Sequence, residues 1–212
     1  AATMATTASS RERVMVSVRV RPLHERDVAS GTGWEWDDQS IVRRAPGDHT
    51  ALTSSAARWT FDNLFGPDDD TAALYDSVAH PVVVGALEGI NGTVFAYGQT
   101  STGKTHTIVG TPQSPGLLPR ALAHVFAAVK GDKSREYLLR VSYLEIYNEV
   151  ISDLLAPTDA TTSTNLAVRQ DVQRGIFVAG LSEEIVVSED ECLALLRRGD
   201  ERRATAATAM NE

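Results

Sequence analysis

The spacing of apolar positions predicts several β-strands along the chain. Residues 14–20 place four valines on one face of an extended segment, which Pro22 ends. Residues 93–97 are a short run of β-branched and aromatic side chains and predict a buried strand, and residues 137–147 predict a longer one. Residues 166–178 are apolar at both ends and polar in the middle, which predicts a hairpin-like pair.

Apolar residues three or four positions apart predict helices between these strands. One helix is expected to have Thr71 as its cap and to be kinked or split at Pro81, which has no N–H to donate. A second helix is expected to start after Lys104. It is interrupted by the Pro- and Gly-rich residues 110–116 and resumes over residues 118–131.

The order of these elements predicts the fold class. Ser188 is expected to cap a last helix, whose acidic first turn suits the positive end of the helix dipole. Residues 1–12 are small and polar and predict a disordered leader, which leaves residues 13–212 as one domain without internal repeats. Strands and helices alternate, so we expect an α/β fold, a mixed sheet with helices on both faces.

The stretch Gly98–Thr105, with the sequence GQTSTGKT, follows the pattern of a phosphate-binding loop (P-loop). Gly98 and Gly103 allow backbone dihedrals that a side chain would forbid, so successive N–H groups can point at an anion. Lys104 supplies a positive charge for the outer phosphates of a nucleotide, and the Thr105 hydroxyl can bind Mg²⁺. The residues between the glycines are Gln99, Thr100, Ser101 and Thr102. The predicted strand before the loop and helix after it favour a P-loop over a plain Gly-rich turn.

Composition narrows the class of protein. The 212 residues carry a net charge of −8, which argues against a broad basic face and therefore against nucleic acid as a partner. Cys192 is the only cysteine, so no disulfide can form within the chain, as is typical of a reducing compartment. No apolar run approaches the roughly 20 residues of a membrane span. The composition therefore predicts an intracellular protein without a membrane span.

Residues 91–107 resemble the P-loop region of a kinesin motor domain. Further segments agree with this family in the same order along the chain: Arg19-Val20-Arg21-Pro22, Gly116–Ala121, Val141–Glu149, Asp153-Leu154-Leu155, and a last group from Gly199 to Asn211. The resemblance implies a P-loop NTPase-like α/β fold of the kinesin motor type. It also implies that Glu212 lies just before the family's switch I, so we expect residues 13–212 to be a C-terminally truncated, partial motor domain.

The same resemblance implies ATP and Mg²⁺ as ligands. Residues Gly98–Thr105 would hold the phosphates, with Thr105 on Mg²⁺. Arg19, Arg21 and Pro22 would lie by the adenine, and His106 would cover the base from the other side. The full-length parent would couple ATP hydrolysis to movement on microtubules, in the cytoplasm and on the microtubule cytoskeleton.

A microtubule contact is implied for Arg169 and Arg174, which lie in a segment that touches the acidic surface of tubulin in kinesins. Val150 stands where several family members have a basic residue, and a solvated basic loop is the alternative interpretation of the two arginines. The sequence leaves the oligomeric state, the direction of movement and the cargo undetermined.

Catalytic residues are not assigned, because switch I, switch II and the neck linker would follow Glu212. Asp153 and Glu145 fit an ordinary structural role better than that of a Mg²⁺-side carboxylate. We expect weak nucleotide binding and negligible hydrolysis from these 212 residues. One alternative is a catalytically inactive nucleotide- or tubulin-binding fragment. Another is an unrelated P-loop enzyme, although it would need an Arg-rich lid that we do not find. A third is a chain that does not fold on its own, because unpaired sheet edges and apolar helix faces would be exposed.

Overall fold

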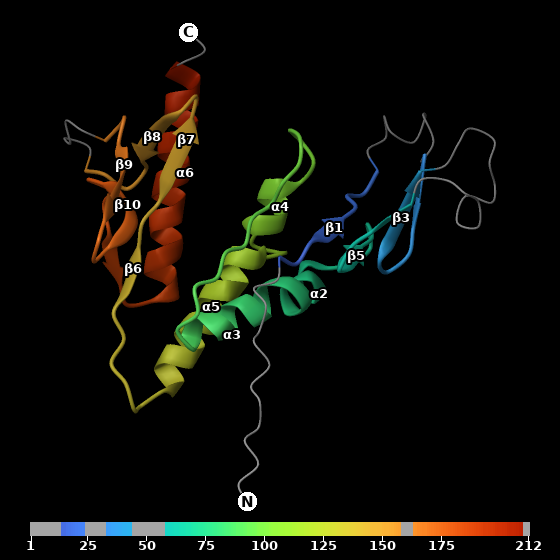
Figure 1. Ribbon diagram of the computed structural model, residues 1–212, viewed down its shortest axis with the longest axis horizontal. Helices are drawn as coiled ribbons and strands as arrows, with labels where there is room; N and C mark the ends of the chain where they lie inside the picture. Colours follow the sequence, from blue (N-terminus) through green and yellow to red (C-terminus); the bar gives the residue numbers. More distant parts are fainter. Residues whose placement is uncertain (1–13, 24–32, 44–57, 158–162, 210–212) are drawn as a thin grey trace, which may run out of the picture. The chain divides into compact units, whose positions relative to one another are not determined.

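The structure is a computed structural model and describes residues 14–23, 33–43, 58–157 and 163–209. The chain forms two compact units, Ala1–Ala121 and Leu122–Glu212 (Figure 1). The leader predicted for residues 1–12 lies outside the described residues. None of the helices in the described ranges combines the length and the apolar character that a membrane crossing requires.

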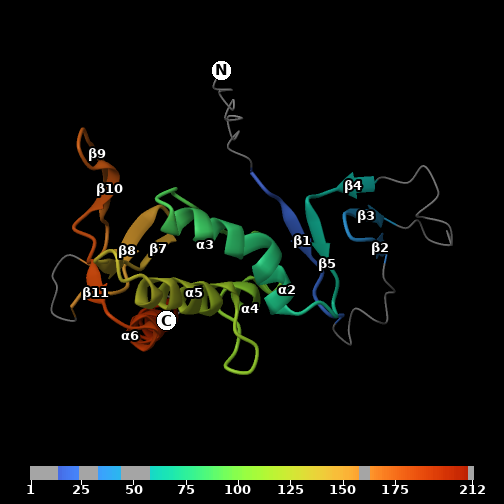
Figure 2. The same cartoon turned by 90° about the horizontal axis from the view of Figure 1, so that it is seen from below.

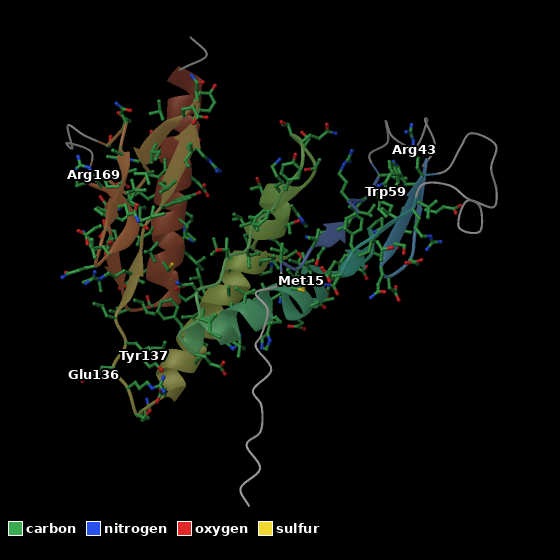
Figure 3. All side chains as sticks on the ribbon, in the orientation of Figure 1. Met15, Arg43, Trp59, Glu136, Tyr137 and Arg169 are labelled. Atoms are coloured by element: carbon green, nitrogen blue, oxygen red, sulfur yellow. The ribbon has the colours of Figure 1, made fainter. Side chains whose placement is uncertain are left out.

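The described part of the first unit contains two small sheets (Figure 2). Strand β1 (Ser17–Arg19) pairs in parallel with β5 (Asn63–Phe65), so the strand predicted over residues 14–20 is confirmed in a shorter form. The second sheet is antiparallel and three-stranded, and consists of β2 (Trp34–Trp36), β3 (Ser40–Arg43) and β4 (Arg58–Thr60). Trp34 and Trp59 lie on one of its faces, with their ring centroids 5.7 Å apart. Trp59 is labelled in Figure 3.

The helix predicted after residue 70 is continuous but irregular. It consists of α2 (Thr71–Leu74), a π-helical turn η1 (Tyr75–Ala79) and α3 (His80–Leu87). The predicted cap is wrong by one residue, because the carboxylate of Asp70 accepts from the Ala73 N–H at 2.7 Å and Thr71 is the first helical residue. Pro81 lies in the first turn of α3, where its missing N–H is tolerated. The wider π turn precedes it, so the helix accommodates the proline without a break.

The core of the first unit lies where these elements meet α4 (Lys104–Ile108) and α5 (Leu117–Gly131). Its buried side chains come from β5, the irregular helix and α5: Phe65, Leu74, Tyr75, Ala79 and Leu117. Ile108 and two further partly buried residues pack against it. The prediction of a helix that stops before residue 110 and resumes near residue 118 is confirmed.

The buried strand predicted over residues 93–97 is wrong for this structure. Residues 91–97, which we term the lead-in segment, are not part of a strand, and Phe95 and Tyr97 are 76% and 96% exposed. Among the residues that the structure describes, none exchanges a backbone hydrogen bond with this segment. A strand forms only by pairing, so its apolar composition alone cannot make it one. The segment does approach α3 at Gly92, where an added Cβ would collide with Val82.

Among its described residues, the second unit contains three antiparallel strand pairs. The strand predicted over residues 137–147 is divided in two, because β6 (Leu139–Val141) pairs with β11 (Glu184–Val186) and β7 (Leu144–Tyr147) pairs with β8 (Val150–Asp153). The hairpin predicted over residues 166–178 is confirmed as β9 (Ala167–Asp171) and β10 (Gly175–Ala179).

Helix α6 (Glu189–Ala209) is capped as the sequence predicts. The Ser188 hydroxyl accepts from the Glu191 N–H at 3.2 Å. Cys192, the only cysteine, is 2% exposed in this helix, as expected of a small buried residue. The arginines of α6 donate to backbone carbonyls of the turn after β8, Arg198 to Leu155 at 3.1 Å and Arg202 to Ala156.

The turn after β8 is organised by the buried carboxylate of Asp153, which is 4% exposed. One of its oxygens accepts from the Leu155 N–H at 2.8 Å and the other from the Ser182 N–H at 2.8 Å. This is a structural role, which agrees with the interpretation of Asp153 from the sequence. The carboxylate satisfies two backbone donors that have little access to water.

We predict that Asp153→Ala lowers the free energy of unfolding by about 2 to 5 kcal/mol, because it leaves the buried Leu155 N–H and the partly buried Ser182 N–H without this acceptor. Denaturant titration measures the loss. Asp171→Ala is the matched control, since Asp171 also accepts from two backbone N–H groups but is exposed, so water can replace it. Equal effects of the two substitutions would contradict the prediction.

Close packing at Gly199 gives a second prediction. An added Cβ would lie 2.7 Å from Tyr143 Cε1 and 3.3 Å from Leu154 Cβ, so α6 can pass these residues only with glycine at this position. We expect Gly199→Ala to lower the free energy of unfolding by about 1 to 3 kcal/mol through overpacking. Gly85→Ala in α3 is the control, because its Cβ would meet only Ile90 Cβ at 3.9 Å. The control should be neutral or stabilising, by up to about 1 kcal/mol.

Candidate nucleotide-binding site

The loop Gly98–Thr105 joins the lead-in segment to α4 in the first unit, and its backbone has the conformations that its glycines predict. Gly103 has φ +96°, in the left-handed region that disfavours side chains. At Gly98 an added Cβ would lie 2.6 Å from the Thr102 hydroxyl, so the loop closes tightly there. Ser101 has φ +64° although it is not a glycine. Such a conformation is uncommon overall, and the residues that adopt it cluster at ligand sites. The local geometry is that of a tightly curled loop, in which the Thr102 N–H donates to the Gln99 carbonyl at 3.4 Å.

The ammonium group of Lys104 lies against the first half of the loop. Lys104 Nζ donates to the carbonyls of Gly98 and Gln99, each at 2.8 Å. The Thr102 hydroxyl also donates to the Gln99 carbonyl at 2.8 Å. These bonds hold the positive charge inside the loop. A phosphate would offer this ammonium a charged acceptor in addition to the neutral carbonyls.

Helix α4 is short, with five residues, none of which is buried. The Thr107 N–H donates to the Gly103 carbonyl at 2.9 Å and closes the first turn. The N–H groups before it have no acceptor within the helix and remain available for an anion. Thr105 and His106 are exposed in this turn. The macrodipole of so short a helix is small, so the backbone N–H groups and Lys104 supply most of the positive potential.

Arg19 ends β1, and the structure places its guanidinium on two hydroxyl groups. It donates to Thr107 Oγ1 at 3.1 Å and to Thr71 Oγ1 at 3.0 Å. Burial lowers the pKa of the Arg19 guanidinium from its usual value, while the carboxylates of Asp69 and Asp70 raise it. The structure therefore brings Arg19 together with α4. Sequence reasoning missed Thr71 and Thr107, because no local pattern marks a contact between residues so far apart in the chain.

The other residues expected near the adenine lie at the surface. Arg21 donates to the Pro22 carbonyl at 3.3 Å, and Pro22 and His106 are exposed. Their proposed place beside a base stays a prediction.

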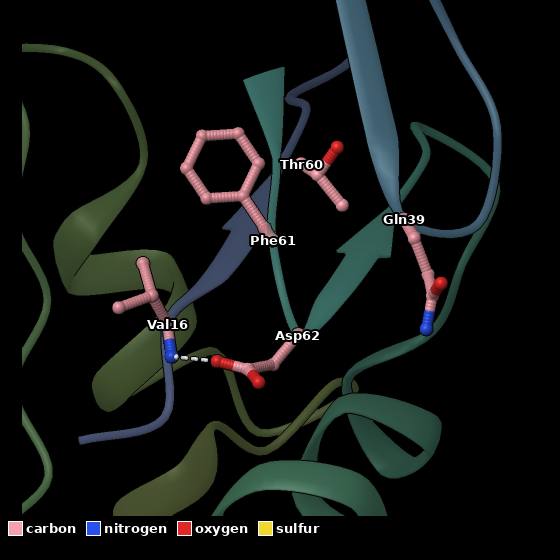
Figure 4. Close-up of a pocket in the computed structure, with 5 residues that line it drawn as sticks. All are labelled: Val16, Gln39, Thr60, Phe61 and Asp62. Carbon is pink, nitrogen blue, oxygen red and sulfur yellow. Dashed lines mark hydrogen bonds between the residues drawn. The ribbon is translucent and has the colours of Figure 1, made fainter. Parts of the chain in front are cut away.

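Two hollows in the first unit are not part of this site. The larger, of about 610 Å³, is lined by Val16, Gln39, Thr60, Phe61 and Asp62 (Figure 4). The Asp62 carboxylate accepts there from the Val16 N–H at 2.8 Å. The smaller, of about 310 Å³, has four aspartates in its lining, which would repel a phosphate: Asp37, Asp38, Asp68 and Asp69. Within the described residues no group of three His, Cys, Asp or Glu side chains could hold a metal ion.

The candidate microtubule contact lies on the β9–β10 hairpin of the second unit. Arg169 pairs with Phe177 across the hairpin (Arg169 is labelled in Figure 3), and the Arg174 guanidinium lies 4.9 Å from the centroid of the same ring. Asp171 accepts from the Arg174 and Gln173 N–H groups at the turn, and these bonds lower the pKa of its carboxyl. The hairpin therefore carries the guanidinium groups of Arg169 and Arg174 next to the same residue, Phe177.

Comparison with known proteins gives a consistent result along the chain. A sequence model of the kinesin motor domain matches residues 19–212. The Kinesin-like protein KIN-7D, mitochondrial, of Arabidopsis thaliana is 46% identical over 208 residues, which are 97% of this chain and 19% of that protein. The Kinesin-like protein KIN-7K, chloroplastic, of Oryza sativa subsp. japonica is 45% identical over 97% of this chain and 18% of its own length. The chain thus spans about a fifth of the length of these relatives.

Comparison of the structure with solved structures finds the same family as comparison of the sequence. The solved structure of a fast kinesin matches with a TM-score of 0.82 and 35% sequence identity, over 94% of this chain and 55% of that one. The predicted α/β fold of the kinesin motor type is confirmed by this match. On the sequence match and the structural match together, the chain belongs to the kinesin motor domain family.

Proposed function

We propose that this chain binds ATP through the loop Gly98–Thr105 and supplies the nucleotide site of a microtubule motor. The observation that carries the proposal is the Lys104 ammonium held 2.8 Å from two carbonyls of a loop whose glycines have the required conformations. A triphosphate brings several negative oxygens, which this charge and the N–H groups at the start of α4 would bind together. The solved relative was studied for its ATPase mechanism, which agrees with a nucleotide ligand.

The residues around Lys104 fit the rest of a Mg²⁺-nucleotide. Thr105 is exposed directly after Lys104, and its hydroxyl would hold Mg²⁺, a hard cation that prefers oxygen ligands. Bound there, the ion would neutralise charge on the outer phosphates. Arg21, Pro22 and His106 would contact the adenine, by stacking of charged and aromatic groups and by apolar contact.

For these 212 residues taken alone we propose nucleotide binding, and not hydrolysis or movement. Phosphoryl transfer depends on groups that orient the attacking water and stabilise charge on the γ-phosphate. The lead-in segment has no strand partner among the described residues, so the loop is held mainly from its α4 side. This observation favours the second candidate function, a nucleotide- or tubulin-binding chain without turnover, for the 212 residues taken alone.

A microtubule is the proposed partner, through Arg169 and Arg174. Residues of β9 are exposed throughout, and the hairpin stands out from the rest of its unit (Figure 2). Two guanidinium groups on such a surface would be attracted to the acidic surface of tubulin. The solved relative was studied for its interactions with microtubules. We therefore propose a location on the microtubule cytoskeleton in the cytoplasm.

Lys104→Ala tests the nucleotide site. We expect it to weaken the binding of a fluorescent ATP analogue with Mg²⁺ by about a hundredfold, because charge-assisted hydrogen bonds to phosphate are lost. Fluorescence titration measures the dissociation constant. Lys130→Ala removes an exposed lysine of α5 and should leave binding unchanged. If the unmodified chain does not bind the analogue, or Lys104→Ala binds it as well, the proposal fails.

A double charge reversal, Arg169→Glu with Arg174→Glu, tests the microtubule contact. We expect about tenfold weaker co-sedimentation with microtubules and a smaller dependence of binding on salt, because two attractive charges become repulsive. Arg197→Glu reverses an exposed charge on α6 and is the control. Equal losses in the two proteins would mean that net charge, and not the hairpin, determines binding.

A further inference from the structure

Helix α4 carries the two residues that matter most for phosphate binding, and only a few contacts attach it to the rest of the first unit. Its first two residues, Lys104 and Thr105, are also the last two of the loop Gly98–Thr105. None of its residues is buried, and only Ile108, at its end, packs against the core of the first unit. The lead-in segment on the other side of the loop makes no backbone hydrogen bond with any described residue. At the end of α4 the Gly116 N–H donates to the Val109 carbonyl at 3.0 Å, so the position of the loop depends on this bond, on Ile108 and on the side-chain contacts of α4.

Arg19 supplies one of these contacts from a well-anchored element. Its backbone lies in the parallel pair of β1 and β5, opposite Phe65, and the next residue, Val20, donates to the Phe65 carbonyl at 2.8 Å. Its guanidinium reaches Thr107 Oγ1 at 3.1 Å with one nitrogen and Thr71 Oγ1 at 3.0 Å with the other. Thr71 is the first residue of α2 and is only 1% exposed, so it is a rigid acceptor.

We propose that Arg19 is a positioning residue for the phosphate-binding loop, because it fixes the first turn of α4 to β1 and α2 through Thr107 and Thr71. The proposal rests on the proposed nucleotide function of the loop. Thr107 lies three residues after Lys104, so the two side chains leave neighbouring positions of one helical turn. The Thr107 N–H also holds the Gly103 carbonyl at 2.9 Å. A displacement of Thr107 would therefore move both Gly103 and Lys104.

The geometry requires arginine and not merely a positive charge. Two nitrogens of one planar guanidinium donate in different directions to two hydroxyl groups, which a lysine ammonium on a single flexible stem reproduces poorly. Thr71 and Thr107 come from different helices, so each bond alone fixes one helix and the pair fixes one relative to the other. The family resemblance places Arg19 beside the adenine, whereas these contacts direct its guanidinium to the helix that bears the phosphate loop.

The two roles differ in the ligands they affect. A residue that contacts the base strengthens the binding of ATP but not of an inorganic chain of phosphates. A residue that positions the loop strengthens the binding of ATP and the binding of the inorganic phosphate chain by the same factor. Mg²⁺-ATP and Mg²⁺-tripolyphosphate are therefore the two probes, and isothermal titration calorimetry on the 212-residue chain measures their affinities.

We expect Arg19→Lys and Thr107→Val each to weaken both probes by about tenfold, as loss of a hydrogen bond to a charged group implies. Thr107→Ser keeps the hydroxyl and should retain the affinity. The double variant should bind no more weakly than the weaker single variant, because both changes remove the same contact. Arg140→Lys makes the same chemical change at an exposed ion pair with Glu183 and is the matched control.

Three results would overturn the proposal. The first is that Arg19→Lys weakens the binding of Mg²⁺-ATP but not of Mg²⁺-tripolyphosphate. The others are an unchanged affinity of Thr107→Val for both probes, and a loss of affinity in the double variant that equals the sum of the two single losses. If the unmodified chain binds neither probe, the nucleotide function fails, and hydrogen exchange then tests the positioning role by itself. In that case Arg19→Lys and Thr107→Val should each speed amide exchange in residues 104–108 by about tenfold, without the same change in α6. Unchanged exchange in α4 would reject the role.

Discussion

The arrangement of β5, the irregular helix and α5 in the first unit depends on one buried cluster. In it Phe65 packs with Leu74, Tyr75, Ala79 and Leu117. This cluster joins the end of β5 to the irregular helix and to α5, and Ile108 attaches α4 to its edge. Because β1 pairs with β5, the same contact also sets the position of Arg19. The polar groups of the candidate site are thus arranged around an apolar core that contains none of them.

In the second unit, hydrogen bonds of charged side chains hold helix α6 and the turn after β8 in place. Asp153 accepts from two backbone N–H groups, and arginines of α6 donate to the carbonyls of the turn after β8. The Tyr143 hydroxyl donates to Asp200 at 2.8 Å on the same helix, next to the tight passage at Gly199. Burial raises the pKa of Tyr143, and the bond to Asp200 raises it further, so the phenol remains protonated and can donate. Helix α6 is therefore held through specific pairs and not only through apolar area.

The candidate nucleotide site combines a well-formed loop with an incomplete surrounding. The loop has the dihedrals and the lysine that a phosphate requires, and its α4 side is attached to the core and to Arg19. Its lead-in side exposes Phe95 and Tyr97 and has no pairing partner in the described ranges. Binding needs the loop alone, whereas catalysis needs the loop held rigidly relative to other groups. For this reason we propose nucleotide binding, and not turnover, for these residues taken alone.

The sequence by itself determined the features that depend on neighbouring residues. The loop Gly98–Thr105, the hairpin of β9 and β10, the interruption before α5 and the cap at Ser188 follow from glycine, proline and short-range spacing, and all appear in the structure. Tertiary structure decided the rest. Residues 93–97 have the composition of a strand but no partner, and Arg19 found its acceptors on Thr71 and Thr107, far away in the chain. Pairing and packing join residues that no local pattern connects, so such contacts are settled only when the chain folds.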